Sequence, residues 1–257
     1  QTPPLFMQVG DKQIGDPPRS IAYRARLASA SGANRPGGVW LGGFRSDMLS
    51  TKAARLDEQA AAQGRAFLRF DYSGHGTSEG LFEDGTIGRW AEDAACVIAA
   101  LTEGPQILIG SSMGGWIALL LATRRKLALR GLIGIAPAPD FTEDLMWAEF
   151  PPAVREAILR DSVWHRPSEY GAPYPITRAL IEDGRNQLLL RGPIALDCPL
   201  RILQGQQDPD VPWRHALRIA EAVTGGDVRV TLIKDGDHRL SREADLALLA
   251  ETLEHIC

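Results

Sequence analysis

Cysteine and histidine are scarce in this sequence, and long hydrophobic runs are absent. The 257 residues include three cysteines, Cys96, Cys198 and Cys257, which lie far apart in the chain. Such sparse and widely spaced thiols predict neither a disulfide framework nor a zinc site, and they are typical of a reducing compartment. No apolar stretch approaches the roughly 20 residues that a membrane-spanning helix needs, so we expect no stable membrane insertion.

A strong charge of either sign is also lacking. The 28 basic and 32 acidic residues give a formal net charge of −4, and no block of basic residues stands out. The chain therefore lacks the electrostatic footprint of a nucleic-acid-binding protein. Its start lacks the basic and apolar segments of a signal peptide, so we expect a cytoplasmic protein. In a eukaryote the mitochondrial matrix fits as well, because removal of a leader would leave a chain that starts at a residue such as Gln1.

The composition is that of an ordinary globular protein, with 44% hydrophobic and 23% charged residues. Along most of the chain, β-prone stretches alternate with stretches of helical periodicity. This alternation predicts an α/β fold with a mostly parallel open sheet and helices on both of its faces. The predicted strands are 6–9, 20–29, 38–41, 65–70, 106–109, 129–135, 200–203 and 228–233, and the predicted helices are 50–63, 86–101, 116–121, 152–160, 212–223 and 241–256.

The alternation is interrupted between residues 140 and 197. This segment holds several prolines and three aromatic patches, and only the stretch 152–160 has a clear helical pattern. We interpret the segment as a small cap inserted into the fold. Residues 1–139 and 198–257 would then form the core.

One stretch joins a strand, a sharp turn and a helix around a serine. A β-prone run ends at Gly110, Ser112 and Gly114 follow, and a helical pattern comes next. In this context G-x-S-x-G is typical of a nucleophile elbow, where the serine stands on a strained turn with its oxygen exposed above the sheet. Ser111 fits less well, because Ile109 stands where its own motif would need glycine. A phosphate-binding loop is disfavoured, since the G-x-x-x-x-G-K-[ST] pattern is absent.

A serine hydroxyl becomes an effective nucleophile when a general base takes its proton and an acid orients that base. In an elbow fold the acid follows the serine in chain order, in a loop after a later strand. Asp208 and Asp210 lie in such a loop, after the predicted strand 200–203. We prefer Asp208 because it is closer to the strand end, whereas Asp210 fits better as a turn former or helix cap.

The candidate for the base is His238, one of five histidines. It follows the last predicted strand and precedes the last helix, so that its loop can reach the elbow. His215 and His255 lie in predicted helices, where we expect them at the surface. His165 lies in the insertion, and His75 precedes the serine in chain order, which makes it a poor base.

Two backbone N–H groups are candidates for holding the negative oxygen that develops during acyl transfer. The residue after the nucleophile, Met113, would supply one of them. The loop after the strand 38–41 would supply the other, and we assign it to Phe44. The adjacent Gly42 and Gly43 permit a close approach of the backbone, although a plain glycine turn is the alternative reading.

Together these pieces resemble the serine α/β-hydrolase superfamily, and nearly the whole chain takes part in the resemblance. The chain looks most similar to the branch that contains the mitochondrial palmitoyl-protein thioesterase, which is also an acyl-glucuronide esterase. The residues that carry the resemblance are Arg69–Gly74 with Gly76 and Ser78, Gly104–Leu108, Gly110–Trp116, Val211–Trp213 and Asp237–Arg239.

The resemblance implies an open, largely parallel sheet with a cap between the sixth and seventh strands, where residues 140–197 lie. It places the nucleophile of the family on Ser112, its acid on Asp208 and its base on His238. Many members of the superfamily have His-Gly after the third strand, where this chain has Gly42-Gly43. A backbone donor does not need that histidine. The substrate does not follow from the resemblance, because caps vary and shape the pocket.

The predicted function is hydrolysis of carboxylic ester or thioester bonds through a Ser-His-Asp triad and an acyl-enzyme. No metal or organic cofactor is needed, and the substrate would be a small-molecule ester or an acylated protein. Activity should fall at acid pH as His238 becomes protonated. Arg45 is a candidate for binding a substrate carboxylate. The aromatic candidates for an acyl pocket, which are otherwise packing residues, are Trp116, Phe141, Trp147, Trp164 and Trp213.

Two other functions remain open on the same fold. A cofactor-free perhydrolase would use the same triad, and a non-catalytic binding protein would have no need of a triad in the correct order. A dehalogenase or an epoxide hydrolase is disfavoured, because these enzymes use an aspartate nucleophile where Ser112 stands. Nothing in the sequence specifies an oligomeric state.

Overall fold

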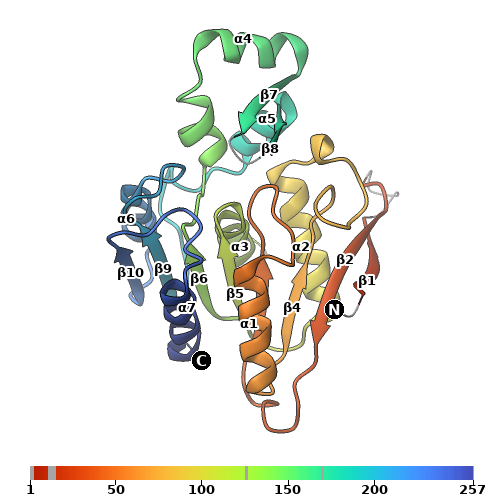
Figure 1. Ribbon diagram of the computed structural model, residues 1–257, viewed down its shortest axis with the longest axis vertical. Helices are drawn as coiled ribbons and strands as arrows, with labels where there is room; N and C mark the ends of the chain where they lie inside the picture. Colours follow the sequence, from red (N-terminus) through yellow and green to blue (C-terminus); the bar gives the residue numbers. More distant parts are fainter. Residues whose placement is uncertain (1–2, 11–15, 125–126, 169–170, 257) are drawn as a thin grey trace.

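The architecture is an eight-stranded sheet with helices on both faces (Figure 1). The computed structural model describes residues 3–10, 16–124, 127–168 and 171–256. The strands of this sheet are β1 (Leu5–Val9), β2 (Arg19–Arg26), β3 (Gly37–Leu41), β4 (Phe67–Phe70), β5 (Gln106–Ser111), β6 (Leu129–Ile135), β9 (Leu200–Gly205) and β10 (Val228–Ile233).

The strand order is β1-β2-β4-β3-β5-β6-β9-β10. The first two strands pair antiparallel with each other, and β2 pairs antiparallel with β4. All later pairs, from β3–β4 to β9–β10, are parallel. The prediction of a mostly parallel open sheet is confirmed. Its consequence for function is that the loops after β3, β5, β9 and β10 all leave from one edge of the sheet.

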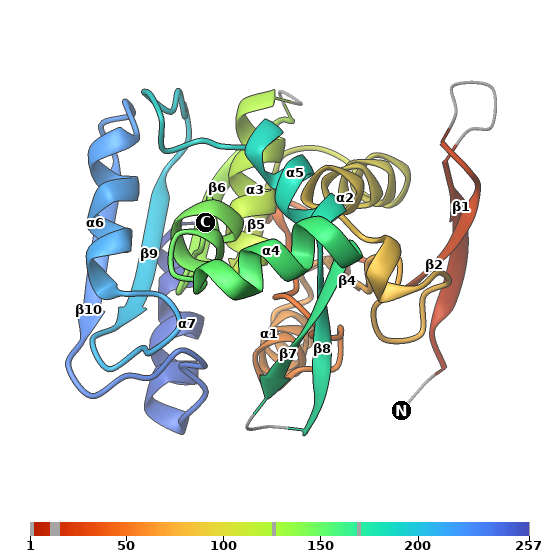
Figure 2. The ribbon, with the colours of Figure 1, turned by 90° about the horizontal axis from the view of Figure 1, so that it is seen from above.

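Helices cover both faces of the sheet, as Figures 1 and 2 show. One face carries α1 (Thr51–Ala62) and α7 (Glu243–Ile256), which pack on one hydrophobic cluster. The other face carries α2 (Ile87–Leu101), α3 (Met113–Arg124) and α6 (Trp213–Ala222), which pack on a second cluster.

The two clusters follow from the alternation of side chains along each strand. In β5, Ile107 and Ile109 join the cluster under α1 and α7, whereas Leu108 joins the cluster on the opposite face. All three side chains are fully buried. Because both faces of the strand are covered, the strand reads as one continuous apolar run, which is typical of a parallel sheet.

Between β6 and β9 the chain builds a separate group of elements above the sheet (Figure 1). We call residues 140–197 the cap segment. It contains the π-helix η3 (Thr142–Trp147), α4 (Pro152–Asp161), the hairpin of β7 (Val163–Ser168) and β8 (Gly171–Thr177), and α5 (Arg178–Asn186).

The sequence pattern revealed only α4 within this segment. The hairpin was not predicted because β8 contains Pro173 and Pro175, residues that usually argue against a strand. A two-stranded ribbon tolerates them, since each of its strands is an edge strand. Helix α5 was not predicted because it is short and contains Gly184. That glycine lets α5 approach η3, because a Cβ atom there would lie 2.2 Å from Thr142 Oγ1.

Asp140 joins the two ends of the cap segment. Its carboxylate is fully buried and accepts the N–H groups of Leu189 and Leu190 at 2.8 and 2.9 Å. Both contacts lie close to the predicted limits of the segment. That residues 140–197 act as one unit stays a prediction.

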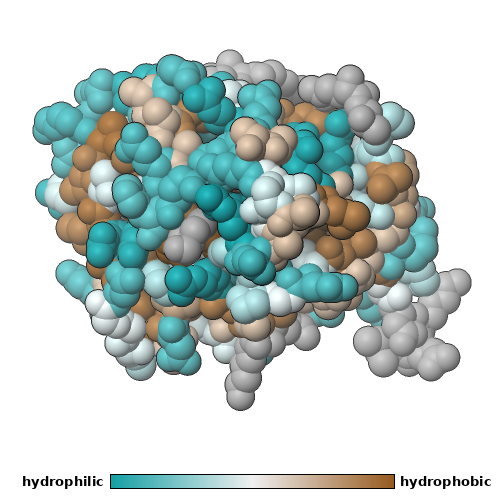
Figure 3. Space-filling view, turned by 90° about the horizontal axis from the view of Figure 1, so that it is seen from below, coloured by the Kyte–Doolittle hydropathy of each residue, from teal (hydrophilic) through white to brown (hydrophobic). Residues whose placement is uncertain are grey.

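The face opposite the cap segment carries hydrophilic residues around separate hydrophobic patches (Figure 3). Within the described ranges, no helix is both long enough and apolar enough to cross a membrane. Cys96 and Cys198 are free thiols, and Cys257 lies outside the described residues.

Candidate active site

Ser112 stands on the sharp turn between β5 and α3. Its φ of 53° is in the left-handed region, which non-glycine residues seldom adopt. The surrounding backbone holds it there: the Ser112 N–H donates to the carbonyl of Ile135 at 2.9 Å, and its carbonyl accepts the N–H groups of Gly115 and Ala138. Strained residues fixed in this way are characteristic of functional sites.

The glycines of the turn have little room for a side chain. A Cβ atom at Gly114 would lie 2.0 Å from the carbonyl oxygen of Leu41, and one at Gly110 would lie 2.3 Å from the carbonyl oxygen of Gly114. A Cβ atom at Gly115 would meet Pro137 at 2.6 Å. The elbow therefore needs glycine at all three positions, and the spacing of the motif is a consequence of close backbone contacts.

His238 lies beside the serine. The loop after β10 places its Nε2 atom 3.2 Å from Ser112 Oγ. The Nδ1 atom on the other side of the ring lies 2.8 Å from Oδ2 of Asp208, in the loop after β9. The Asp208 side chain is fully buried and that of His238 is 24% exposed. The structure thus brings together the three residues predicted as nucleophile, base and acid, in the order that proton transfer requires.

Asp208 is the centre of a dense set of hydrogen bonds. Its Oδ1 accepts the N–H groups of Asp210 and Val211, both at 2.8 Å. Its Oδ2 accepts the side-chain amide of Gln204 at 3.0 Å in addition to His238. These contacts use the four lone-pair positions of a carboxylate. Asp210 is exposed and donates its backbone N–H to Asp208.

Among the described residues, Asp208, Asp210 and His238 form the one group of three side chains with ligand atoms close enough to hold a metal ion, within 4.8 Å of one another. Both oxygens of Asp208 already accept two hydrogen bonds each. A cation would have to displace the His238 contact or the backbone contacts. The arrangement therefore suits a histidine partner better than a metal ion.

Gln204 contacts Asp208 and was not predicted as a site residue. This residue is the last but one of β9, is fully buried, and donates its side-chain amide to Asp208 and to the carbonyl of Val211 at 3.0 Å each. Lys52 was not predicted either. Its Nζ atom on α1 donates to the carbonyl of Arg239, beside His238, and burial lowers the pKa of Lys52 to about 8. Gln204 and Lys52 belong to no motif, and they reach the site only in the folded chain. The sequence alone therefore gave no signal for them.

The two predicted oxyanion donors come from two segments that meet at the serine. Met113 follows it in the elbow, and the loop after β3 lies against it, since a Cβ atom at Gly43 would be 3.5 Å from Ser112 Cβ. Within the described part of the chain, the N–H groups of Phe44 and Met113 donate to no other acceptor. Both are therefore free to bind a substrate oxygen.

Of the residues predicted to bind substrate, Phe141 and Trp116 contact each other, and both are buried. The Phe141 ring contacts Phe44 with centroids 5.7 Å apart and Trp116 with centroids 5.6 Å apart. Arg45 is exposed, and its guanidinium lies 5.0 Å from the centroid of the Tyr174 ring of β8. Tyr174 was not predicted, and it also contacts Phe44.

The other three predicted residues have partners of their own. The guanidinium of Arg185 lies 4.9 Å from the centroid of the Trp147 ring. Trp164 packs against Phe150 within the cap segment. Trp213 lies beneath its neighbour Arg214 on α6. These contacts favour the alternative that was left open for these three side chains, namely that they are packing residues.

The expectation that His215 lies at the surface is wrong. Its side chain is buried, and its Nε2 atom lies 2.8 Å from the carbonyl oxygen of Pro139. Burial lowers its pKa. The position of His215 in the first turn of α6 suggested exposure. In the structure this turn packs against the segment that follows β6, which includes Pro139.

Comparison with known proteins identifies the family of the chain. Residues 48–168 match the family described as serine aminopeptidase, S33. The bovine mitochondrial palmitoyl-protein thioesterase ABHD10 is 38% identical over 239 residues, which cover 92% of this chain and 76% of that protein. The chain belongs to the ABHD10 family of α/β-hydrolases.

Two solved structures support the assignment to the ABHD10 family. Mouse ABHD10 has a TM-score of 0.85 and 34% identity, with 98% of each chain covered. A putative hydrolase from Agrobacterium vitis has a TM-score of 0.93 and 43% identity, again with 98% of each chain covered. The predictions of the family, of the α/β-hydrolase fold and of a hydrolytic enzyme are confirmed.

Proposed function

We propose that this ABHD10-family hydrolase cleaves acyl thioesters and esters through an acyl-enzyme on Ser112. The observation that carries the proposal is the continuous line from Ser112 Oγ through His238 to Asp208, with distances of 3.2 and 2.8 Å. In this line a neutral imidazole donates from Nδ1 to the carboxylate and accepts the serine hydroxyl at Nε2.

The first half-reaction transfers the acyl group to the serine. His238 takes the proton of Ser112 as Oγ attacks the substrate carbonyl, and Asp208 stabilises the imidazolium that forms. The N–H groups of Phe44 and Met113 bind the oxygen of the tetrahedral intermediate. When the intermediate collapses, His238 gives the proton to the leaving thiolate or alkoxide, and the acyl group stays on Ser112.

The second half-reaction returns the enzyme to its starting state. Water takes the place of the leaving group and gives a proton to His238 as its oxygen attacks the acyl-enzyme carbonyl. The same two N–H groups hold the second oxyanion. Collapse releases the carboxylic acid and restores the hydroxyl of Ser112, so that no metal or organic cofactor takes part.

The relatives support a thioester as substrate, since they are named palmitoyl-protein thioesterases and mitochondrial proteins. We assign this chain an acyl thioester and, for a eukaryotic source, a mitochondrial location. Phe44 and Phe141, whose rings are in contact, would form an apolar wall for the acyl group beside the oxyanion donors, with the fully buried Trp116 behind Phe141. In this proposal the cap segment closes the acyl site from above.

The decisive experiment measures turnover of nitrophenyl esters from two to sixteen carbons and of a palmitoyl thioester, with Ser112→Ala as the blank. Serine-dependent turnover with the highest kcat/KM at long chains would support the thioesterase assignment. A maximum at short chains would make the protein a small-molecule carboxylesterase. Activity that survives in Ser112→Ala would exclude Ser112 as the nucleophile.

A fluorophosphonate probe separates an enzyme from a binding protein on the same fold. The probe reacts with an activated serine, so Ser112 should be labelled in the wild type and not after His238→Ala. Mass spectrometry of the labelled peptide identifies the residue. An unlabelled wild type without esterase activity would favour the binding protein.

A further inference from the structure

The loop after β4 holds the loop that carries Phe44. Residues 71–79 follow β4, and residues 42–49 follow β3. The Met48 N–H donates to Asp71 Oδ1 at 2.7 Å, and the Arg45 N–H donates to Nε2 of His75 at 3.2 Å. The second of these bonds lies one residue from the predicted oxyanion donor.

The partners of His75 fix its tautomer. Its Nδ1 atom lies 3.2 Å from the carbonyl oxygen of Ser73, which can only accept a hydrogen bond. The Arg45 N–H can only donate. His75 must therefore carry its proton on Nδ1 and offer a lone pair at Nε2. Protonation of the ring at Nε2 would remove the acceptor for Arg45.

The Arg45 N–H belongs to the central peptide of a tight turn. The Ser46 N–H donates to the carbonyl of Gly43 at 3.0 Å and closes the turn from Gly43 to Ser46. Arg45 has a φ of 57° at the third position, which is the conformation of a type II turn. A type I turn would rotate the Phe44–Arg45 peptide and point its N–H away from His75. The hydrogen bond thus selects one turn type.

The surroundings of His75 keep its ring neutral and in place. The ring makes edge contacts with Tyr72, Phe82 and Trp90 at centroid distances of 5.0 to 5.6 Å. Burial is the main reason why the pKa of His75 falls to about 4; the hydrogen bond to the Ser73 carbonyl opposes this shift, and the positive charge of Arg45 adds to it. The acceptor at Nε2 is accordingly present at neutral pH.

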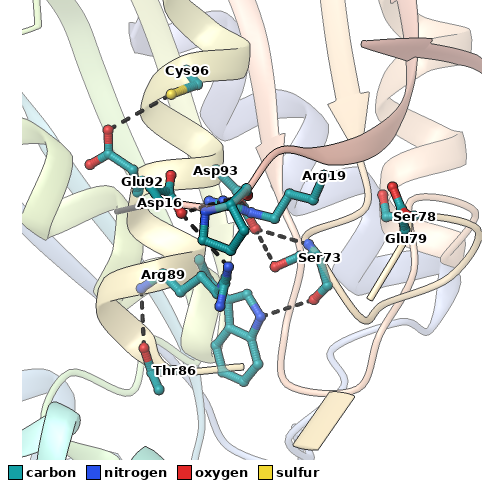
Figure 4. A network of polar contacts seen from close by, with 12 residues as sticks. Asp16, Arg19, Ser73, Ser78, Glu79, Thr86, Arg89, Glu92, Asp93 and Cys96 are labelled. Atoms are coloured by element: carbon teal, nitrogen blue, oxygen red, sulfur yellow. Dashed lines mark hydrogen bonds and ion pairs between the residues drawn. The ribbon is translucent and has the colours of Figure 1, made fainter. Parts of the chain in front are cut away.

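A buried ion pair anchors the same loop from behind (Figure 4). Asp93 on α2 accepts the Arg19 guanidinium at 2.7 Å and both the N–H and the hydroxyl of Ser73 at 2.9 and 2.7 Å. The carbonyl of Ser73 then accepts the indole N–H of Trp90 at 3.1 Å as well as His75. His75 therefore contacts a buried hydrogen-bond network through Nδ1 and the Arg45 N–H of the turn through Nε2.

We propose that His75 is a positioning residue of the oxyanion hole: by accepting the Arg45 N–H, it fixes the peptide that follows Phe44 and holds the Gly43–Ser46 turn against the elbow, so that the Phe44 N–H in this turn stays in place for the substrate oxygen. The inference rests on the proposed function, since it concerns the oxyanion of that reaction. It explains why an imidazole occupies an aromatic cage without contact to the triad.

A matched pair of substitutions isolates the acceptor. In His75→Gln the side-chain oxygen reaches the position of Nε2, whereas in His75→Asn the shorter side chain reaches only that of Nδ1. We expect His75→Asn to lower kcat about 10- to 100-fold with KM within about twofold, because misdirecting one donor removes part of its 10²- to 10³-fold contribution. His75→Gln should recover kcat to within about fivefold of the wild type.

A trifluoromethyl ketone supplies a second readout. It forms a hemiketal with the active-site serine whose oxyanion occupies the oxyanion hole. Its inhibition constant should rise in His75→Asn by the same factor as kcat falls, and should stay near the wild-type value in His75→Gln. His75→Phe keeps the ring and removes the acceptor, so it should behave like His75→Asn. Should one variant not fold, the other two still form a comparison.

Three outcomes would overturn the inference: unchanged kcat in His75→Asn and His75→Phe, equal losses in the Asn and Gln variants, or an unchanged inhibition constant. Urea unfolding of each variant excludes a simple loss of folded protein. Labelling of wild-type Ser112 by a fluorophosphonate is measured first. If that label is absent, the proposed function fails. If it is present and the variants behave like the wild type, only the role of His75 fails.

Discussion

Asp208 and His238 form a direct pair, with Oδ2 of the carboxylate 2.8 Å from Nδ1 of the imidazole, across 30 positions of sequence. The neighbouring Asp210 is exposed and supplies only its backbone N–H to Asp208. Both aspartates were candidates for the acid from the sequence. Because only the Asp208 side chain contacts His238, substitution of each aspartate tests which one is the acid.

Asp208→Asn should lower kcat by on the order of 10³- to 10⁴-fold, because an amide cannot hold His238 in the required tautomer or stabilise its protonated form. Asp210→Asn is the matched control two residues away, and it should change kcat less than about threefold. Steady-state kinetics on a nitrophenyl ester measures both. A larger loss in the Asp210 variant would assign the acid to Asp210.

Gly114→Ala tests the close contacts of the elbow. The added methyl group would lie 2.0 Å from the carbonyl oxygen of Leu41, a backbone atom that cannot rotate away. We expect a loss of about 1–3 kcal/mol in the free energy of unfolding, together with loss of activity in the folded fraction. At Gly226 a Cβ atom meets nothing within 4 Å, so Gly226→Ala is the control. Equal urea midpoints for the two variants would contradict a sterically closed elbow.

The elbow turn and the meeting of Ser112, Asp208 and His238 could be predicted, because both follow from turn residues and from the order of the strands. Ser112 is flanked by glycines that the turn requires, and Asp208 and His238 each follow a strand that ends at the same edge of the sheet. Chain order and strand ends were sufficient to select them.

The residues that support the site could not be predicted in this way. Gln204 and Lys52 reach Asp208 and the His238 loop from other elements, and their roles exist only once the fold has formed. His75 was rejected as a base for its place in the chain, and its contact with Arg45 depends on two loops that meet across the β3–β4 pair. His215 was wrongly expected at the surface for the same reason: its burial depends on tertiary packing.

The burial of His75 predicts a dependence of stability on pH. An unfolded histidine binds a proton below a pH of about 6.5, whereas folded His75, with a pKa of about 4, does so only in stronger acid. The contribution to stability is complete above pH 6.5 and is lost as the pH falls toward 4, by about 3 kcal/mol at most. The buried His215, whose pKa is also lowered, acts in the same direction.

Urea unfolding at pH 7 and pH 5 measures this effect. Wild-type stability should fall more steeply between the two values than that of His75→Gln, which cannot titrate there and keeps His215. The exposed His255 supplies the control, because His255→Gln should follow the wild type. Identical slopes for the wild type and His75→Gln would mean that His75 titrates like an exposed histidine.

The position of Phe141 predicts a change in acyl-chain preference. Its ring contacts Phe44 of the loop after β3 and Trp116 of α3, with centroid distances of 5.7 and 5.6 Å. Phe141→Leu should open space for longer acyl chains, and each further methylene that becomes buried would contribute about 0.8 kcal/mol, or about fourfold in kcat/KM. The ratio of kcat/KM for eight-carbon to four-carbon nitrophenyl esters should rise accordingly.

Phe6→Leu makes the same exchange at an exposed position of β1 and should leave the ratio unchanged. A ratio unaltered by Phe141→Leu would place the acyl chain elsewhere, so that Phe141 would be a packing residue of the cap segment.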